Sequence, residues 1–365
     1  MRADHAVSFA SGAALGFACD LAFGDPRRGH PVAAFGRAAA AVERRLWHDH
    51  RGYGALHTLL CAGGAAAGAA LLTRTVRLPA AGPARTATGP GRTATPGPSS
   101  SPAARSLSRA ADIALTAAAT WSVLGGTSLR REALAIGDAL AAGDLAAARA
   151  RLPHLCGRDP QALDGQQIAR AVVESVAENT SDAVVGALVW GAIGGVPGLV
   201  GFRAVNTLDA MVGHKSPRHR RFGWASARLD DVAGWPGARL TAALATVAGP
   251  DPRGARRVWR ADGGTHPSPN AGPVEASFAG ALGVRLGGTL AYGGRVEHRP
   301  VLNAHGRPVE VPDIARAARL SRRVGALALA TSVAGRLAVC ALRSALSDGG
   351  RRTVRPKAAG PGAAG

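Results

Sequence analysis

The chain has 365 residues, of which 47% are hydrophobic but only 4% aromatic, and its formal net charge is +20. An Ala- and Gly-rich composition favours helices packed closely through small side chains over sheets of β-branched and aromatic residues. The Arg residues are scattered between apolar stretches, which argues against nucleic acid as a partner. The 4 cysteines form no CxxC pair, so they indicate neither a disulfide framework nor a zinc site.

Several apolar runs with few or no charges approach the roughly 20 residues that a helix needs to cross a bilayer, although Asp20, Arg239 and Arg336 lie within three of them. They cover residues 7–19 with an extension to 23, 55–73, 113–129, 183–202 and 324–342, with a shorter run at 235–249. In the second run, Gly64 and Gly68 have the small-xxx-small spacing of close helix contacts. We expect an all-α, polytopic integral membrane protein with about four to six membrane-embedded helices and cytoplasmic helical loops. A large soluble helical protein is the alternative.

Composition divides the chain into four parts. Residues 1–78 carry N-terminal membrane helices, residues 79–109 are of low complexity, residues 110–347 form a membrane and catalytic core, and residues 348–365 are a polar tail. The second and fourth parts are too poor in large apolar residues to form a core, so we expect them to be disordered. Within the core, the charges in residues 130–159 punctuate an Ala/Leu pattern typical of an amphipathic helical hairpin.

An acidic stripe is the most informative local pattern. Glu174, Glu178 and Asp182 recur at i, i+4 and i+8, which places them on one face of a helix. Like charges at this spacing destabilise a helix unless positive charge lies over them. The stripe suits Mg²⁺, which binds through one or two carboxylates together with substrate phosphates. A solvated charged face explains the spacing equally well.

A second acidic motif follows the broken apolar run. Asn206 and Asp209 share a helix face, and Arg228 precedes the adjacent carboxylates Asp230 and Asp231. A basic run lies between these groups and consists of Lys215, Arg218, His219, Arg220 and Arg221. Carboxylates beside cations are typical of a metal–phosphate site. The basic run alone is explained more simply as a cytoplasmic interface anchor.

Two further loops have the composition of ligand-binding turns. The first, FGDPRRGHP at residues 23–31, contains Asp25, Arg28 and His30. The second, SPNAGPVE at residues 268–275, contains Ser268, Asn270 and Glu275. The sequence has no GxxxxGK[ST] pattern, so any use of ATP is not of the P-loop kind.

Four stretches together resemble the CobD/CbiB family, the adenosylcobinamide-phosphate synthases. They read LAFGDPRRGHPVAAFGR, ARAVVESVAENTSDAVVGAL, FRAVNTLDAMVGHKSPRHRRFGWASARLDDVAGWPGARL and SPNAGPVEASFAGALGVRLGG, and they cover most of the chain in the family's order. Residues 79–105 are longer than the family leads one to expect, and Ser181 stands where a Val is common.

The resemblance implies amidation of a propionate of adenosylcobyric acid by (R)-1-amino-2-propanol or its O-phosphate, with ATP and Mg²⁺ as cofactors. It also implies a multi-pass protein of the cell membrane with membrane lipid around it, an active site facing the cytoplasm, and other late cobalamin-pathway enzymes as partners. On this hypothesis the catalytic residues are Glu174, Glu178, Asp182, Asp209, Lys215, Asp230 and Asp231, with Glu174, Glu178 and Asp182 binding Mg²⁺. The substrate-binding residues are Asp25, Arg28, His30, Asn179, Asn206, Arg228, Ser268, Asn270 and Glu275.

The segment between the two acidic motifs sets a topological condition. If residues 183–202 crossed the membrane fully, the motifs would lie on opposite sides. The Gly194-Gly195-Val196-Pro197-Gly198 sequence interrupts the run, and irregular backbone at membrane depth is tolerated where protein buries it. We therefore expect the segment to enter and return, which leaves the basic stretch 79–105 outside, against the positive-inside tendency.

Three other functions fit parts of the sequence. A transporter also has broken helices and intramembrane polar residues, but the chain lacks the repeated halves typical of one. A membrane phosphotransferase with an acidic Mg²⁺ cluster shares the carboxylates but leaves the SPNAG and FGWASARLDD stretches unexplained. A non-catalytic scaffold for corrin enzymes would retain its function after Glu→Gln substitutions.

Overall fold

The computed structural model describes residues 2–26, 29–77, 102–157, 159–214, 216–292 and 295–352. Most of these residues are helical, and five short 3₁₀ or π turns (η1–η5) join or interrupt the helices. In chain order the elements are α1 (Arg2–Phe23), α2 (Pro31–Leu46), α3 (Arg51–Thr58), η1 (Leu59–Gly63), α4 (Gly64–Arg77), α5 (Pro102–Val123), α6 (Gly126–Ala141), α7 (Leu145–Arg151), η2 (Leu152–His154), η3 (Pro160–Ala162), α8 (Gly165–Thr180), η4 (Ser181–Val185), α9 (Gly186–Gly194), α10 (Val196–Leu208), η5 (Asp209–Gly213), α11 (Trp224–Ala248), α12 (Pro252–Asp262), α13 (Ala271–Leu282), β1 (Leu286–Tyr292), β2 (Arg295–Leu302) and α14 (Val311–Arg352).

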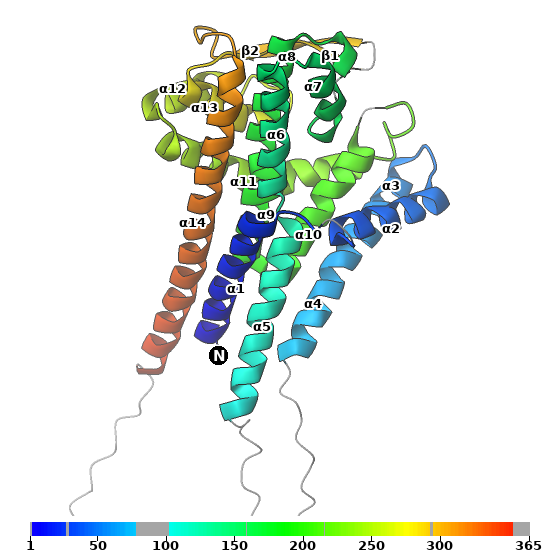
Figure 1. Ribbon diagram of the computed structural model, residues 1–365. Coiled ribbons are helices and arrows are strands. Elements are labelled where there is room, and N and C mark those ends of the chain that lie inside the picture. Colours follow the sequence, from blue (N-terminus) through cyan, green and yellow to red (C-terminus); the bar gives the residue numbers. More distant parts are fainter. Residues whose placement is uncertain are drawn as a thin grey trace, which may run out of the picture.

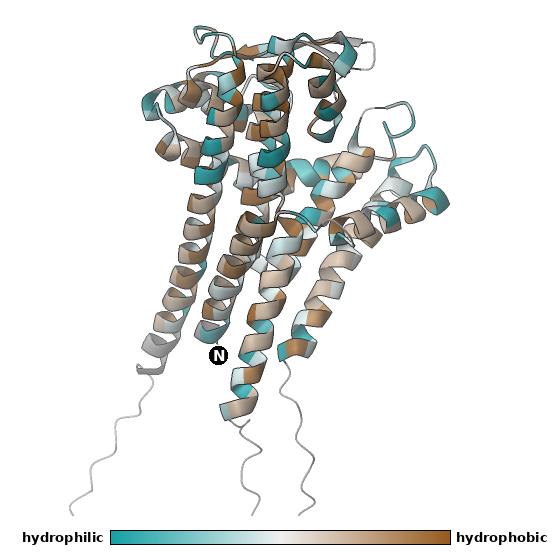
Figure 2. Ribbon diagram, viewed as in Figure 1, coloured by the Kyte–Doolittle hydropathy of each residue, from teal (hydrophilic) through white to brown (hydrophobic). Residues whose placement is uncertain are grey.

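The lower parts of α1, α4, α5 and α14 extend toward one end of the molecule, and α8, α12, α13, β1 and β2 lie at the other end (Figure 1). Helices α2, α3, α9, α10 and α11 lie between the two ends. Three described stretches are long and apolar enough to cross a membrane, namely Asp4–Phe23, Arg51–Arg77 and Val311–Leu346. These stretches confirm the first, second and last of the predicted runs. Hydrophobic residues, in brown, predominate along the ribbon of α1 (Figure 2). The expected total of about four to six membrane-embedded helices stays a prediction.

Close contact between α1 and α5 depends on two glycines. A Cβ on Gly12 would lie 2.5 Å from Thr116 Cβ, and one on Gly16 would lie 2.4 Å from the carbonyl oxygen of Ala117. By contrast, a Cβ on Gly64 or Gly68 would meet nothing within 4 Å. The small-xxx-small contact predicted at Gly64 and Gly68 is therefore absent from the described part of the chain, and α1 makes such a contact instead.

This difference predicts opposite outcomes for two matched substitutions. Gly16→Ala forces α1 and α5 apart and should lower the free energy of unfolding by about 1–3 kcal/mol, the usual cost of overpacking. Gly68→Ala adds a methyl group in open space and should change it by less than about 0.5 kcal/mol. Denaturant unfolding of both variants in detergent measures the difference, and equal destabilisation would contradict the assigned interface.

Three predicted boundaries are wrong. Residues 113–129 do not form one helix, because α5 ends at Val123 and α6 begins at Gly126. At this break the amide of Gly125 donates a hydrogen bond to the carbonyl of Ala183 at 3.2 Å, so the chain turns where it meets η4. Residues 102–109 belong to α5 rather than to a disordered loop, and α14 continues to Arg352 instead of ending before residue 348. Residues 79–101 and 353–365 lie outside the described residues.

The interrupted apolar run folds back on itself as α9 and α10, which pack against each other. Gly195 joins them with a φ of +66°, in the left-handed region that favours glycine. Gly198 lets the helices approach, because a Cβ there would lie 2.1 Å from the carbonyl oxygen of Trp190. The segment folds back as expected, while its entry into a membrane stays a prediction. The amphipathic hairpin predicted at residues 130–159 corresponds to α6 and α7.

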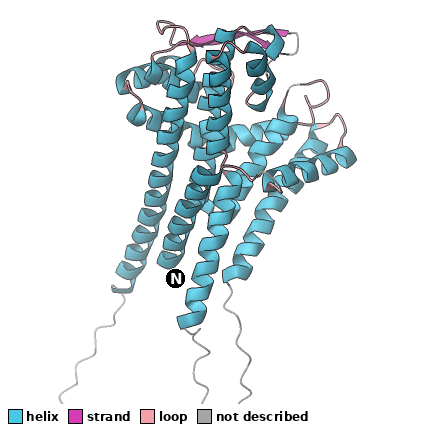
Figure 3. Cartoon of the chain, viewed as in Figure 1, coloured by secondary structure: helices cyan, strands magenta, loops and turns pink. Residues whose placement is uncertain are grey.

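The expectation of an all-α fold missed one antiparallel pair, β1 and β2, at the end opposite the extended helices (Figure 3). Gly287 and Gly288 begin this pair with φ values of +77° and +85° and lie at an irregularity in its register. Glycine adopts such backbone angles without the steric cost that a Cβ imposes. The end of the Gly-rich run of residues 280–288 therefore provides the backbone conformation at the start of β1.

Candidate functional site

A cavity of about 880 Å³ lies among α8, η4, η5, α11 and α13. This volume falls in the upper part of the range typical of small-molecule sites. The carboxylates that line the cavity come from both predicted acidic motifs and from α13, and they are Glu174, Glu178, Asp182, Asp209, Asp230, Asp231 and Glu275. The fold-back of α9 and α10 thus brings the two motifs to one place.

Helix α8 supplies the acidic stripe, and its three members have different surroundings. A capping box begins the helix, in which Asp164 accepts a hydrogen bond from the amide of Gln167. Glu178 is exposed to the cavity, whereas Glu174 is buried. The Oε1 atom of Glu174 accepts a hydrogen bond from the amide of Gly287 at 2.7 Å and lies 4.0 Å from Nε of Arg170. Glu174 therefore connects α8 to β1.

The carboxylates of Glu178, Asp182, Asp209 and Asp230 form an acidic cluster in the cavity and repel one another. Burial raises the pKa of Asp182 well above its usual value, and the charges of Glu178 and Asp230 raise it further. Burial and the charge of Asp209 raise the pKa of Asp230 to about 7. Burial also raises the pKa of Asp209, against the opposing effect of His214. A group that brings positive charge among these carboxylates would relieve the repulsion.

Polar contacts hold the start of α11 against its neighbours. The side-chain amide of Asn206 donates to Oδ1 of Asp230 at 3.4 Å, and Arg228 lies 3.3 Å from Oδ2 of Asp231. Asn270 donates from Nδ2 to the carbonyl oxygen of Asp231 at 2.9 Å. Its Oδ1 accepts a hydrogen bond from Arg239 at 2.9 Å. Asn270 therefore positions the Asp230–Asp231 turn from the opposite wall.

The loop before α13 completes that wall. Ser268 Oγ accepts hydrogen bonds from the amides of Asn270 at 3.3 Å and Ala271 at 3.1 Å, which caps the helix. His266, which the sequence patterns did not single out, lies 4.0 Å from Glu275 and 3.5 Å from Arg299. Burial lowers the pKa of His266, and the nearby Arg299 charge lowers it further, which favours the neutral ring. Sequence spacing gave no signal for His266 or Arg299, because α13 and β2 meet only in the fold.

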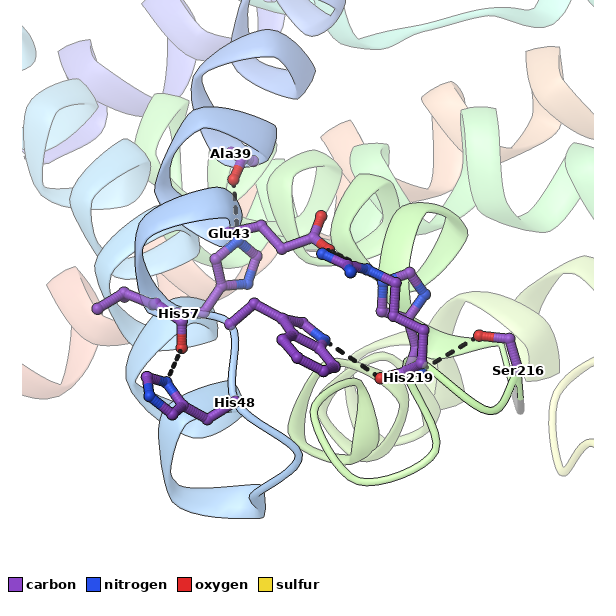
Figure 4. A network of polar contacts seen from close by, with 9 residues as sticks. Ala39, Glu43, His48, His57, Ser216 and His219 are labelled. Carbon is purple, nitrogen blue, oxygen red and sulfur yellow. Dashed lines mark hydrogen bonds and ion pairs between the residues drawn. The ribbon is translucent and has the colours of Figure 1, made fainter.

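The basic run is attached to α2 by a polar network (Figure 4). Glu43 Oε1 accepts hydrogen bonds from His219 at 3.0 Å and from Arg218 at 3.2 Å. The amide of His219 donates to Ser216 Oγ, and the Trp47 ring nitrogen donates to the Arg218 carbonyl.

Two other residues of this region, His214 and Arg220, line the large cavity. Lys215 lies outside the described residues.

A second, smaller cavity of about 280 Å³ contains two of the predicted residues that the large one lacks. Asp25 and Asn179 line it, together with Arg203 from α10, and Leu155 lines both cavities. His30 lines neither cavity. Its Nδ1 accepts a hydrogen bond from the amide of Val32 and so caps α2. Asn206 contacts Asp230 without lining either cavity itself. Arg28 lies outside the described residues.

These features define a helical protein whose described residues include three candidate membrane spans and an acidic cavity. A family model described as CobD/Cbib protein matches residues 13–321. The chain therefore belongs to the CobD/CbiB family of cobalamin biosynthesis proteins.

Individual relatives agree with this assignment. The chain is 49% identical over 328 residues to cobalamin biosynthesis protein CobD of Mycobacterium tuberculosis, covering 89% of this chain and 95% of the relative. It is 41% identical over 302 residues to CobD of Geobacter metallireducens, covering 80% and 85%. It is 38% identical over 327 residues to CobD of Chromobacterium violaceum, covering 89% and 96%. No solved structure matches the chain significantly.

Proposed function

We propose that this chain catalyses an ATP-dependent amide ligation in cobalamin biosynthesis. The substrates are a propionate of adenosylcobyric acid and (R)-1-amino-2-propanol or its O-phosphate. The observation that carries the proposal is the convergence of both acidic motifs and the SPNAG loop in one cavity, beside the cationic groups Arg220, Arg228 and Arg299. Membership of the CobD/CbiB family supports the corrinoid substrate.

A divalent cation fits the residues of this cavity. Its donors are carboxylate oxygens, the ligands that Mg²⁺ prefers. No group of three or more His, Cys, Asp or Glu side chains is arranged to hold a metal by itself in the ranges that the structure describes. Mg²⁺ commonly needs only one or two carboxylates when phosphates complete its shell. We place Glu178, Asp182 and Asp230 nearest the cation and assign Glu174 to positioning, since it binds the Gly287 amide.

The reaction needs an activated carboxylate, because a free carboxylate is a poor electrophile. ATP converts it to an acyl phosphate with release of ADP. The amine nitrogen then forms the C–N bond while the C–O bond to phosphate breaks, so that RCOOPO₃²⁻ and RNH₃⁺ give RCONHR, HPO₄²⁻ and H⁺. Bound Mg²⁺ would neutralise the nucleotide phosphates. Arg220 and Arg228 orient anionic oxygen atoms, and Ser268 and Asn270 hold the wall of the cavity.

A direct assay tests the reaction. Membranes that contain the chain are incubated with adenosylcobyric acid, ATP and Mg²⁺, and either the free or the phosphorylated amine is added. We expect the amide and ADP to form in equal amounts, with no amide when ATP or the amine is omitted. ATP hydrolysis without amide formation, or transport of the corrinoid without covalent change, would overturn the proposal.

The perturbed carboxylates predict how pH and Mg²⁺ act together. A raised folded-state pKa means that the native chain binds more protons than the unfolded chain between about pH 4 and 7, so stability without cation falls as pH rises through this interval. Mg²⁺ competes with these protons and should raise the melting temperature more at pH 8 than at pH 5.5. Asp230→Asn should weaken this pH dependence. A Mg²⁺ effect that is equal at both pH values would contradict the assignment.

Location and partners follow from the same proposal. We place the chain in the cell membrane, with membrane lipid around the candidate spans and the cavity facing the cytoplasm, where ATP is available. Other late cobalamin-pathway enzymes are the partners that such a position would serve.

A further inference from the structure

The second cavity contains two polar groups of opposite charge without full hydrogen bonding. The Oδ1 atom of Asp25 and the Nε atom of Arg203 are both buried and have no hydrogen-bond partner among the described residues. Unpaired polar atoms are costly to bury, so a ligand or water that satisfies them would be stabilised there. Both residues line the cavity of about 280 Å³.

Two other polar side chains of this cavity, Glu132 and Asn179, already have partners for some of their atoms. Glu132 Oε1 accepts hydrogen bonds from Arg151 at 3.0 Å and His154 at 3.1 Å, so its charge is balanced. Asn179 uses its Nδ2 to bind the carbonyl and hydroxyl oxygens of Ser175, which leaves its Oδ1 as an acceptor. The cavity therefore offers an anionic group, a carbonyl acceptor and a cationic group.

Arg203 connects the two cavities electrostatically. It interacts with the charge of Asp25 in the small cavity and with that of Asp182 in the large one. It makes no ion pair within 4.0 Å with either carboxylate, so its charge is not fully used by the described residues. Leu155 lies in the walls of both cavities, and Asn179 follows Glu178 along α8. A molecule in the small cavity is thus next to the acidic cluster.

We infer that the small cavity is the subsite of the acceptor amine, with Arg203 as its specificity-determining residue. The ligand class is a small primary amine that also carries a phosphate or similar anionic group. Its ammonium binds Asp25 Oδ1 and Asn179 Oδ1, and its anionic group binds the Arg203 guanidinium. This inference rests on the proposed amide ligation and assigns the amine a place beside the acyl group.

Equilibrium binding to the purified full chain in detergent tests the subsite. The probes are 1-amino-2-propanol, its O-phosphate and inorganic phosphate, each titrated by calorimetry. A charge-assisted pair with Arg203 should make the phosphorylated amine bind at least about tenfold more tightly than the free amine. Arg203→Gln should reduce this preference to about twofold or less, with Arg203→Lys between the two because it keeps the charge but loses the planar fork.

Two acidic residues of the same cavity provide a matched comparison. Asp25→Asn should weaken the binding of both amines by at least about tenfold, because it removes the partner of the ammonium group. It should leave the affinity for inorganic phosphate unchanged. Glu132→Gln should change amine binding by less than about threefold, since Arg151 and His154 already satisfy that carboxylate. Thermal melting of each variant checks that it is folded.

The results separate this inference from the proposed reaction. Three results would overturn the subsite. Folded Arg203→Gln could keep the full preference for the phosphorylated amine, Asp25→Asn and Glu132→Gln could have equal effects on amine binding, or neither amine could bind. If such results accompany amide formation by the wild-type chain, the reaction stands and the subsite lies elsewhere. If the predicted binding pattern is found but no amide forms with either amine, the subsite stands and the proposed reaction fails.

Discussion

Glu178→Gln should lower the rate of amide formation by at least about 100-fold, the usual scale for removing one group that stabilises a reacting charge. Glu178 faces the cavity from the acidic stripe, and its charge acts directly on Asp182 and Asp230. The amide side chain has nearly the same shape but cannot supply the anionic oxygen atoms that a cation requires. Single-turnover amide formation, measured with saturating ATP and Mg²⁺, gives the rate.

A matched control distinguishes this effect from a general loss of charge. Glu310 is 69% exposed at its side chain and lies before α14, away from both cavities, so Glu310→Gln should leave the rate within about twofold. Membrane insertion should be unchanged in Glu178→Gln, and the melting temperature without Mg²⁺ should not fall, because the residue is exposed to the cavity and its charge repels Asp182 and Asp230. Full activity in folded Glu178→Gln would refute the role of the acidic cluster.

Gly198→Ala should destabilise the chain by about 1–3 kcal/mol and also reduce amide formation. The added methyl group would lie 2.1 Å from the Trp190 carbonyl oxygen, which is backbone and cannot rotate away. The α9–α10 hairpin must then open, and this hairpin sets Asp209 relative to Asp182. Activity and unfolding free energy should therefore fall together, unlike in Glu178→Gln.

Gly194→Ala is the control within the same hairpin. A Cβ on Gly194 meets nothing within 4 Å, and Gly194 does not have a positive φ. Its substitution should change stability by less than about 0.5 kcal/mol and leave activity unchanged. Comparable losses in both variants would show that glycine flexibility, rather than the close approach of Gly198 to Trp190, explains the hairpin.

The sequence predicts the parts of the fold that depend on local pattern. Hydrophobic runs of sufficient length locate three candidate spans, and the spacing of Glu174, Glu178 and Asp182 places them on α8. The glycine-rich break around Gly195 predicts that the chain returns, because glycine adopts backbone angles, such as the positive φ found here, that few other residues adopt. The sequence does not predict the pairing of β1 with β2, because a short two-stranded sheet depends on contacts with α8 and α13.

The individual roles in the site were harder to obtain from sequence. Equal spacing suggests equal roles for the three members of the acidic stripe. In the structure, Glu174 is buried and accepts a hydrogen bond from the Gly287 amide, whereas Glu178 faces the cavity. Arg203 and His266 were not identified, because neither lies in a charged pattern. Each becomes noticeable only when α10 or the loop before α13 meets segments distant in sequence.

The most direct test of the central claim, that both acidic motifs face one cavity on one side of the membrane, is an accessibility measurement. Glu178→Cys and His214→Cys are introduced separately into a chain whose 4 native cysteines are replaced by Ala or Ser. A membrane-impermeant thiol reagent is then applied to sealed vesicles of each orientation. We predict that both cysteines react from the same, cytoplasmic side, because α9 and α10 fold back between them. Reaction from opposite sides would contradict the shared cavity and the function proposed for it.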